Sequence, residues 1–241
     1  CLGVIAFSNS LHNEFVHDDN FQIVRNPYLH SDQPISRVLF SDVWGYQSPG
    51  RGGISNYYRP LQMLTYRWII QFVGLDPFVF HLVSLTFHLL AAIMVYLLLW
   101  KLTGAYGISL ATCLLFTLHP IHTEAVSWIA GLTELGCAVF YFLSLWLFFQ
   151  WYDLQNCSGE RIRSVRHKNV ANFISLNTFL MIGSALFFGV ALLWKEMAVT
   201  LPLIIFCYII VVPRELSKLR ARLLRGIIVL LPYLVTFSVY L

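Results

Sequence analysis

The sequence has few charged residues, and this scarcity excludes an ordinary soluble domain. Asp, Glu, Lys and Arg make up 12% of the 241 residues, and hydrophobic residues make up 58%. About a quarter of the residues are charged in a typical soluble protein. A membrane-spanning helix needs roughly 20 mostly apolar residues, so the chain has room for about six or seven such helices and one sizeable loop. We therefore expect an all-α polytopic membrane protein.

Paired cysteine motifs and internal repeats are also missing. Three of the five cysteines lie inside apolar runs, and the other two, Cys1 and Cys157, have no partner at a characteristic spacing. This pattern predicts neither a disulfide framework nor a CxxC zinc site. The absence of a repeat gives no support to a solenoid or other repeat architecture. The net charge of +4 is interpreted as membrane topology, and no nucleic-acid partner is expected.

Changes in composition divide the chain into four expected parts. Residues 1–8 are apolar but too short to span, and we interpret them as the end of a truncated first transmembrane helix. Residues 9–59 are rich in Gly, Pro, Asp and Ser and predict a long first luminal loop with structure of its own. Residues 60–77 carry apolar side chains at helical spacing among polar ones, which is typical of an interfacial helix. Residues 78–241 predict the transmembrane helical bundle.

Six apolar runs predict the spans of this bundle. They cover Phe78 to Trp100, Tyr106 to Leu118, Leu135 to Tyr152, Phe173 to Trp194, Ala198 to Val212, and Gly226 to the end. Lys and Arg are concentrated in 153–172 and 213–225, which predicts that these two connections are cytoplasmic. The first loop, 119–134 and Lys195-Glu196 then share the opposite side. The sequon Asn156-Cys157-Ser158 would face the cytoplasm, where no glycan is attached.

The first candidate site follows the truncated helix, where Asp18 and Asp19 are adjacent. Two neighbouring carboxylates at a membrane edge can raise the pKa of one of them and so provide a general base. The alternative is an acidic turn in a solvated loop.

The second candidate site is His119-Pro120-Ile121-His122-Thr123-Glu124, followed by Glu134. The two histidines are three residues apart, so the zinc-protease pattern, with histidines four apart on one helix, is absent. In the alternative interpretation the histidines satisfy loop carbonyls and Thr123 caps a helix. Ionisable groups at membrane depth nevertheless favour a functional site.

Two further candidates carry cations. Lys195-Glu196 separates two apolar spans with almost no loop, and Arg59 precedes the interfacial helix. Lys195 provides a point charge for an anionic headgroup, and Arg59 can hold a phosphate through two hydrogen bonds. The alternative for Lys195 is a side chain that ends a helix with its charge at the interface.

Six segments in order resemble one known family over nearly the whole chain: the transmembrane and TPR repeat-containing protein O-mannosyltransferases (TMTC family) and their bacterial homologues. The segments are Asp18-Asp19 with Asn26-Pro27, Asp42-Val43-Trp44-Gly45, Tyr58-Arg59-Pro60-Leu61, Phe80-His81-Leu82, His119 to Val126, and Lys195-Glu196. In family members an Arg commonly occupies the position of Leu132. The family also carries TPR repeats after its membrane domain, so the resemblance implies that this chain is the N-terminal membrane part.

The resemblance implies a GT-C glycosyltransferase fold whose long first luminal or periplasmic loop supplies the acidic motif. It implies transfer of mannose, with inversion, from dolichyl phosphate mannose to Ser or Thr of a protein acceptor, which is cadherin-like in the family. Asp18 or Asp19 is then the base. The residues expected to bind the donor phosphate and substrate are Arg59, His119, His122, Glu124, Glu134, Lys195 and Glu196. We expect neither a cofactor nor a metal, because a monophosphate donor carries less charge than a pyrophosphate.

Two other functions remain open at this stage. A polytopic transporter would place ionisable residues near the bilayer midplane and often shows inverted repeats, whereas here these residues lie at span ends. A non-catalytic anchor or scaffold would carry a decayed site. The expected location is the endoplasmic reticulum membrane in a eukaryote and the inner membrane in a bacterium.

Overall fold

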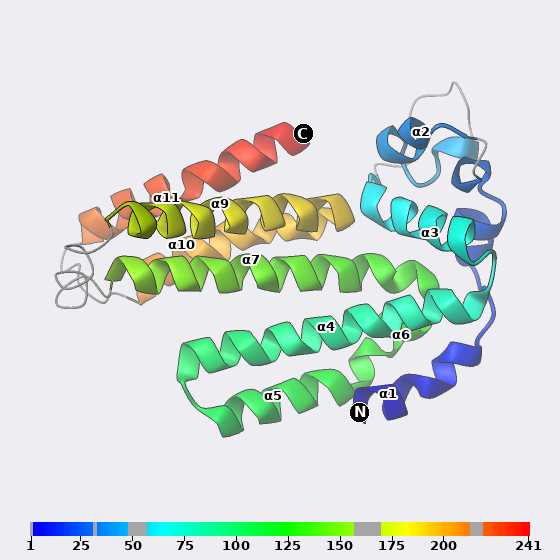
Figure 1. The fold of residues 1–241 in the computed structure, drawn as a ribbon, viewed down its shortest axis with the longest axis horizontal. Coiled ribbons are helices and arrows are strands. Elements are labelled where there is room, and N and C mark those ends of the chain that lie inside the picture. The colour runs from blue at the N-terminus through cyan, green and yellow to red at the C-terminus, as the bar shows by residue number, and fades with distance from the viewer. Residues whose placement is uncertain (1, 31–32, 48–56, 157–169, 213–218) are drawn as a thin grey trace. The chain divides into compact units, whose positions relative to one another are not determined.

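The computed structural model describes residues 2–30, 33–47, 57–156, 170–212 and 219–241. All regular elements in these ranges are helices (Figure 1). This confirms the predicted all-α membrane fold. The sequon at Asn156 lies largely outside the described residues, as do most of the basic residues that were used to predict the cytoplasmic side.

The chain divides into two compact units. The first comprises Cys1–Val139 and Leu193–Lys195, and the second comprises Phe140–Leu192 and Glu196–Leu241. Every candidate site residue except Glu196 belongs to the first unit.

The first unit contains a series of short helices and three longer ones. The short elements are α1 (Leu2–Phe7), η1 (Ser8–His12), η2 (Asn20–Val24), η3 (Pro27–Leu29), α2 (Ile35–Phe40), η4 (Gly45–Gln47), η5 (Pro120–His122), α6 (Thr123–Ser127) and η6 (Ile129–Gly131). The longer ones are α3 (Pro60–Phe72), α4 (Pro77–Thr103) and α5 (Tyr106–Leu118), followed by the start of α7 (Leu132–Asn156). The first loop thus contains several short helical turns of its own.

Local sequence signals set the ends of α4. Asp76 caps its start by accepting a hydrogen bond from the Phe78 N–H at 3.0 Å, and Pro77 occupies the first helical position. Gly104 ends the helix in the left-handed conformation, with φ of 66°. α5 then returns alongside α4, and the His88 ring contacts the carbonyl oxygen of Thr117 at 3.1 Å. This hairpin brings His119, at the end of α5, back toward the end where α4 begins.

The helix α3 forms where the interfacial helix was predicted. Its polar residues Gln62 and Arg67 are buried, while Trp68 and Phe72 are exposed. Arg67 donates to the carbonyl oxygens of Tyr28 and Gln33, at 3.3 and 2.7 Å. One face of α3 therefore holds the first loop, and the opposite face presents apolar side chains. The interfacial position of the helix stays a prediction.

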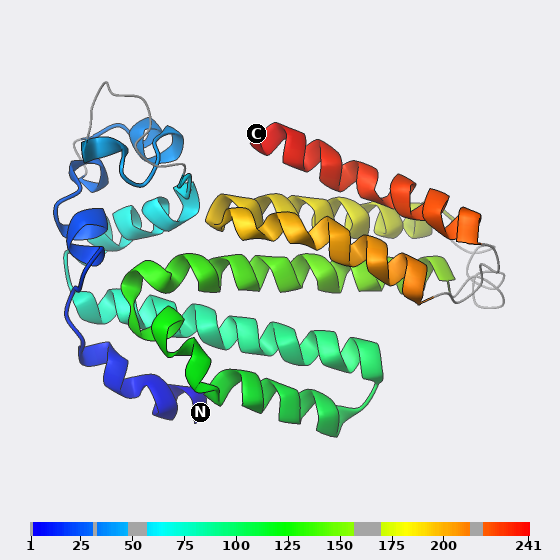
Figure 2. The ribbon, with the colours of Figure 1, turned by 180° about the vertical axis from the view of Figure 1, so that it is seen from behind.

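The second unit contains the rest of α7 with α9 (Val170–Trp194), η7 (Glu196–Thr200), α10 (Leu201–Val211) and α11 (Leu219–Tyr240). Ser144 and Ser184 each donate to the other's backbone carbonyl oxygen, at 2.6 and 2.7 Å, and Ser184 also bonds the Tyr233 hydroxyl. These buried hydrogen bonds join α7, α9 and α11. The helices of this unit are also visible from behind in Figure 2.

All six predicted spans are helical. Among the described residues, four stretches are long and apolar enough to cross a membrane: Pro77–Thr103, Ile129–Gln155, Ser175–Trp194 and Leu219–Tyr240. Tyr106–Leu118 and Glu196–Val211 are apolar but shorter. The last helix begins seven residues earlier than predicted, so Arg220, Arg222 and Arg225 lie on its first turns and not in a loop.

Candidate active site

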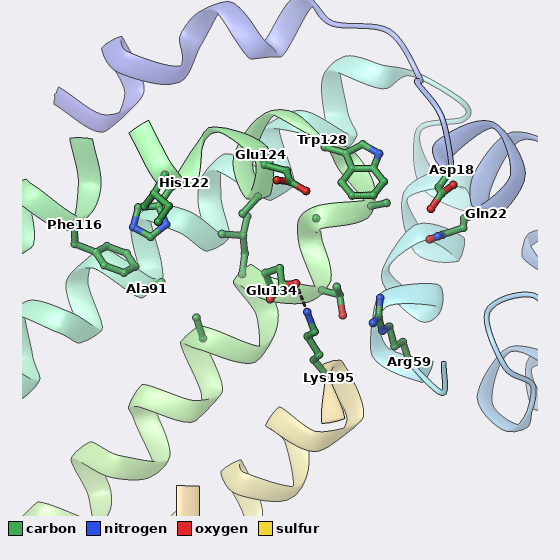
Figure 3. A pocket seen from close by; sticks show the side chains of 17 residues that line it. Asp18, Gln22, Arg59, Ala91, Phe116, His122, Glu124, Trp128, Glu134 and Lys195 are labelled. Carbon is green, nitrogen blue, oxygen red and sulfur yellow. Dashed lines mark hydrogen bonds and ion pairs between the residues drawn. The ribbon is translucent and has the colours of Figure 1, made fainter. Parts of the chain in front are cut away.

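The first unit contains a cavity of about 490 Å³ beside the first loop. Its wall is built from the turn at Asp18 and η2, the start of α3, residues of α4 and α5, the segment from η5 to η6, the first turns of α7, and Lys195. Figure 3 shows its polar side chains. This size lies in the range of small-molecule sites.

Six of the nine predicted site residues line this cavity: Asp18, Arg59, His122, Glu124, Glu134 and Lys195. Asp19, His119 and Glu196 are not part of its wall. The structure therefore gathers side chains that are up to 177 positions apart in sequence, from Asp18 to Lys195 (195 − 18 = 177).

Asp19 is fully buried and is not part of the cavity wall. One carboxylate oxygen accepts a hydrogen bond from the Val16 N–H at 3.1 Å, and the other accepts one from the Ala130 N–H at 2.9 Å. Burial raises the pKa of Asp19 from 3.8 to about 6, although both hydrogen bonds oppose the shift. The carboxylate thus connects the first loop to η6, and both of its oxygens are occupied by the backbone.

Asp18 has a different position, although it is the next residue in the chain. It lines the cavity and also a second, more open cavity of about 500 Å³. The second cavity is lined by Val16, His17, Asp18, Glu124 and Trp128. The residues that both cavities share are Asp18, Glu124 and Trp128. Asp18 therefore lies on a wall between two spaces that could hold two reactants.

Two cations lie on the wall of the first cavity. The Lys195 ammonium forms an ion pair with Glu134, and its side chain is 16% exposed. The Thr133 hydroxyl donates to the backbone carbonyl oxygen of Trp194, which fixes the chain just before Lys195. The Arg59 guanidinium lies over the Tyr57 ring, 4.9 Å from its centroid. Both cations face a space in which an anionic group can be bound.

The two histidines of the second candidate site have separate places. His119 is exposed, and its Nδ1 accepts a hydrogen bond from the Ile121 N–H at 3.1 Å, so it caps η5. His122 lines the cavity with its ring against Phe116, at a centroid distance of 4.4 Å. Burial lowers the pKa of His122, and the neighbouring His88 and His119 lower it further. His122 is therefore a neutral hydrogen-bonding group at neutral pH.

Two residues of the cavity wall were missed from sequence. Gln22 is 6% exposed, and among the described residues neither its Oε1 atom nor the buried Trp128 Nε1–H has a hydrogen-bond partner. Gln22 lies in the π-helical turn η2, which no pattern in the sequence predicts. Trp128 resembles the many aromatic residues of a membrane interface. Only the fold brings these two residues to the cavity.

Comparison with known proteins relates the chain to one group. It is 34% identical over 200 residues to protein O-mannosyl-transferase tmtc2 of Xenopus laevis, which covers 83% of this chain and 22% of that protein. Human protein O-mannosyl-transferase TMTC1 is 33% identical over 199 residues, covering 81% of this chain and 21% of that protein. Human TMTC3 is 32% identical over 201 residues, covering 83% and 20%. The chain belongs to the TMTC family.

This confirms the resemblance deduced from the six sequence segments. The chain spans about a fifth of the length of these TMTC relatives. No protein-family model matches the chain, and no solved structure is significantly similar to it.

Leu132, the position at which the family resemblance led us to expect Arg, is fully buried at the start of α7. It is not part of the cavity wall, which already carries Arg59 and Lys195. The leucine therefore does not remove either of the two cations that face the cavity.

Replacing Gly131 by Ala is expected to destabilise the site. A Cβ atom at Gly131 would lie 2.8 Å from the backbone oxygen of Ala125 and 2.9 Å from its Cα. Backbone atoms cannot move aside as a flexible side chain can, so we expect a loss of about 1–3 kcal/mol of stability. Thermal unfolding in detergent measures this loss. Gly107→Ala is the matched control, because it is helical and nothing lies within 4 Å of its added Cβ. Equal melting temperatures of the two variants would contradict the prediction.

The raised pKa of Asp19 predicts a pH dependence of stability. The native state binds this proton more tightly than the unfolded state, so the contribution is fully present below pH 3.8 and is lost as the pH rises through about 6. The shift corresponds to at most about 3 kcal/mol. Thermal unfolding between pH 4 and 7 should therefore show that the stability of the wild type, relative to Asp19→Asn, falls as the pH rises. A difference that rises with pH over this range would contradict the assignment.

Proposed function

We propose that this part of the protein forms the catalytic site of a membrane glycosyltransferase. The enzyme moves mannose from dolichyl (polyprenyl) phosphate mannose to Ser or Thr hydroxyl groups of a protein acceptor. The names of the relatives support mannosyl transfer to protein. The single observation that carries the proposal is the position of Asp18, on the wall shared by two cavities, of which one also carries Arg59 and Lys195.

Asp18 is the better candidate for the base. A general base must reach the proton that it removes, at hydrogen-bond distance or through one water. Both oxygens of Asp19 accept backbone N–H groups and its side chain is fully buried. Asp18 is half-buried and borders both cavities. We assign Asp19 the task of positioning Asp18 and η6.

The reaction is a single displacement. The acceptor hydroxyl, held on the side of the second cavity, gives its proton to the Asp18 carboxylate and its oxygen forms a bond to the anomeric carbon. The bond from this carbon to the phosphate oxygen breaks, and the electron pair stays on the phosphate. Attack from the face opposite the phosphate inverts the anomeric centre. The proton leaves Asp18 for solvent after the product departs.

The leaving phosphate gains negative charge, and preorganised cations stabilise such charge in the transition state. Lys195 and Arg59 provide these positive charges, and Glu134 holds the Lys195 ammonium in place until the donor arrives. The neutral His122 ring and the Glu124 side chain complete the polar wall. A leaving monophosphate carries less negative charge than a pyrophosphate. We therefore propose that these side chains act without a metal ion.

The donor's lipid explains why such an enzyme is a membrane protein. A polyprenyl chain stays in the bilayer, and the cavity wall also contains the apolar side chains Ala91, Phe116 and Leu135. The enzyme would work in the endoplasmic reticulum membrane of a eukaryote, or in the inner membrane of a bacterium. The cadherin-like acceptor and the TPR region remain expectations from the family.

Transfer of labelled mannose tests the proposal. The full-length protein in lipid vesicles should label a Ser- and Thr-containing acceptor with polyprenyl phosphate mannose and not with a nucleotide-linked mannose. Labelling that requires the nucleotide donor would overturn the choice of donor. A protein that transfers from neither donor would favour the scaffold. Uptake of a solute into vesicles, abolished by Asp18→Asn, would favour the transporter.

A further inference from the structure

We propose that Gln22 and Trp128 recognise the sugar of the lipid-linked donor and set the enzyme's sugar preference. The inference rests on the proposed function, because it assigns one part of the same cavity to the hexose.

Gln22 lines the cavity and carries a buried, unsatisfied acceptor. It lies in η2, and its backbone N–H donates to the carbonyl oxygen of Asp18 at 2.7 Å. Its backbone oxygen accepts from the Asn26 side chain at 3.2 Å. The side chain is 6% exposed, yet Oε1 has no hydrogen-bond partner in the described structure. A buried acceptor left without a partner costs about 1–3 kcal/mol, and a turn of the Gln22 amide toward a ligand hydroxyl in the cavity would remove this cost.

Trp128 lines the same cavity and carries a buried, unsatisfied donor. It follows α6, and its backbone N–H donates to Glu124 at 3.0 Å while its carbonyl oxygen accepts from Gly131 at 3.0 Å. The backbone is thus fixed on both sides. The indole Nε1–H is buried and has no partner among the described residues. Its ring borders both cavities.

The Asp19 carboxylate connects the segments that carry Gln22 and Trp128. Its bond to the Ala130 N–H, 2.9 Å long, joins the turn that contains Gln22 to η6, which directly follows Trp128. Figure 3 shows both side chains with Asp18 among the residues of the wall. An acceptor, a donor and the proposed base are therefore supplied by two segments that the fold ties together.

The chemistry of these atoms selects a hydroxyl-rich ligand. An amide oxygen repels a phosphate, which is itself an acceptor, but it accepts a hydrogen bond from a hydroxyl group. The indole N–H donates to a hydroxyl oxygen, and the ring offers a flat apolar surface to the C–H face of a sugar. The phosphate of the donor is bound by Lys195 and Arg59 instead. A site that pairs buried polar groups with particular hydroxyls discriminates against a sugar that places one of them elsewhere.

The experiment compares Trp128→Phe and Gln22→Met in the full-length protein. Trp128→Phe keeps an aromatic ring and removes the N–H, and Gln22→Met keeps the length of the side chain and removes the acceptor. Three quantities are measured: kcat/KM with polyprenyl phosphate mannose, kcat/KM with the corresponding glucose donor, and the inhibition constant of polyprenyl phosphate without a sugar. The matched controls are Trp68→Phe and Gln71→Met, because both residues are exposed on α3 and outside the cavity wall.

We expect kcat/KM for the mannose donor to fall about tenfold in each variant, which is the loss of one good hydrogen bond. The preference for mannose over glucose should narrow, and the inhibition constant of sugar-free polyprenyl phosphate should stay unchanged. An unchanged sugar preference, or inhibition that weakens in parallel with kcat/KM, would overturn the inference while the proposed function stands. A wild-type protein that transfers no sugar would overturn both.

Discussion

Replacing Asp18 by Asn is expected to lower the rate of sugar transfer by about 100- to 10,000-fold, the usual contribution of a positioned general base. The amide has nearly the shape of the carboxylate but cannot take the acceptor's proton. Since Asp18 borders both cavities and is only half-buried, the substitution should leave the fold intact. The measurement is single-turnover transfer of labelled mannose by protein of unchanged melting temperature.

Glu14→Gln provides the control for Asp18→Asn. Glu14 is an exposed acid of the same loop and is not part of either cavity wall. Its variant should transfer at the wild-type rate. Asp19→Asn should also lose activity, but together with stability, because its amide group would face one of the two backbone N–H groups that the carboxylate now binds. A stable, inactive Asp19 variant beside an active Asp18→Asn would reverse the assignment of the base.

The second large effect is expected from Lys195→Met. Removing one preorganised group that stabilises developing negative charge typically costs about 100- to 1,000-fold in rate. Methionine keeps most of the apolar length of lysine, so the packing next to Trp194 should survive. The ion pair with the half-exposed Glu134 contributes at most about 1 kcal/mol to folding. The loss should therefore be measured in kcat for the lipid-linked donor and not in the melting temperature.

Arg25→Met is the matched control for Lys195→Met. Arg25 is an exposed cation of the same unit, 5.2 Å from the centroid of the Phe21 ring, and it is outside the cavity wall. This control should retain full activity. If Lys195→Met also retained it, the ion pair with Glu134 would be a structural feature and the leaving phosphate would need another partner.

Long-range periodicity made the helical fold predictable. The apolar runs predicted the helical stretches of the bundle, and α4 extends the predicted run by one residue at its start and by three at its end. The start of α11 was misplaced because its first turns are basic: Arg220, Arg222 and Arg225 gave this stretch the composition of a loop. Hydrophobicity alone does not distinguish a polar helical end from a connection.

The candidate site was predictable in composition but not in arrangement. Asp18 and Asp19 are equivalent in the sequence, and only the contact of Asp19 with Ala130, 111 positions away, separates a buried carboxylate from an accessible one. His119 and His122 were likewise equivalent until the turn at η5 made the first a cap. Gln22 could not be predicted as a site residue, because a glutamine in a loop is common and its burial depends on the π-helical turn η2.

The central claim is that mannose is transferred in a single displacement. The donor phosphate is bound in the first cavity, the acceptor lies on the side of the second, and Asp18 lies on the wall that both cavities share. The anomeric configuration of the transferred mannose tests this claim most directly. Nuclear magnetic resonance of the mannosylated acceptor, compared with the donor, should show that the configuration at the anomeric carbon is inverted. A retained configuration would require a glycosyl-enzyme intermediate and a nucleophile in place of the base, and it would contradict the account.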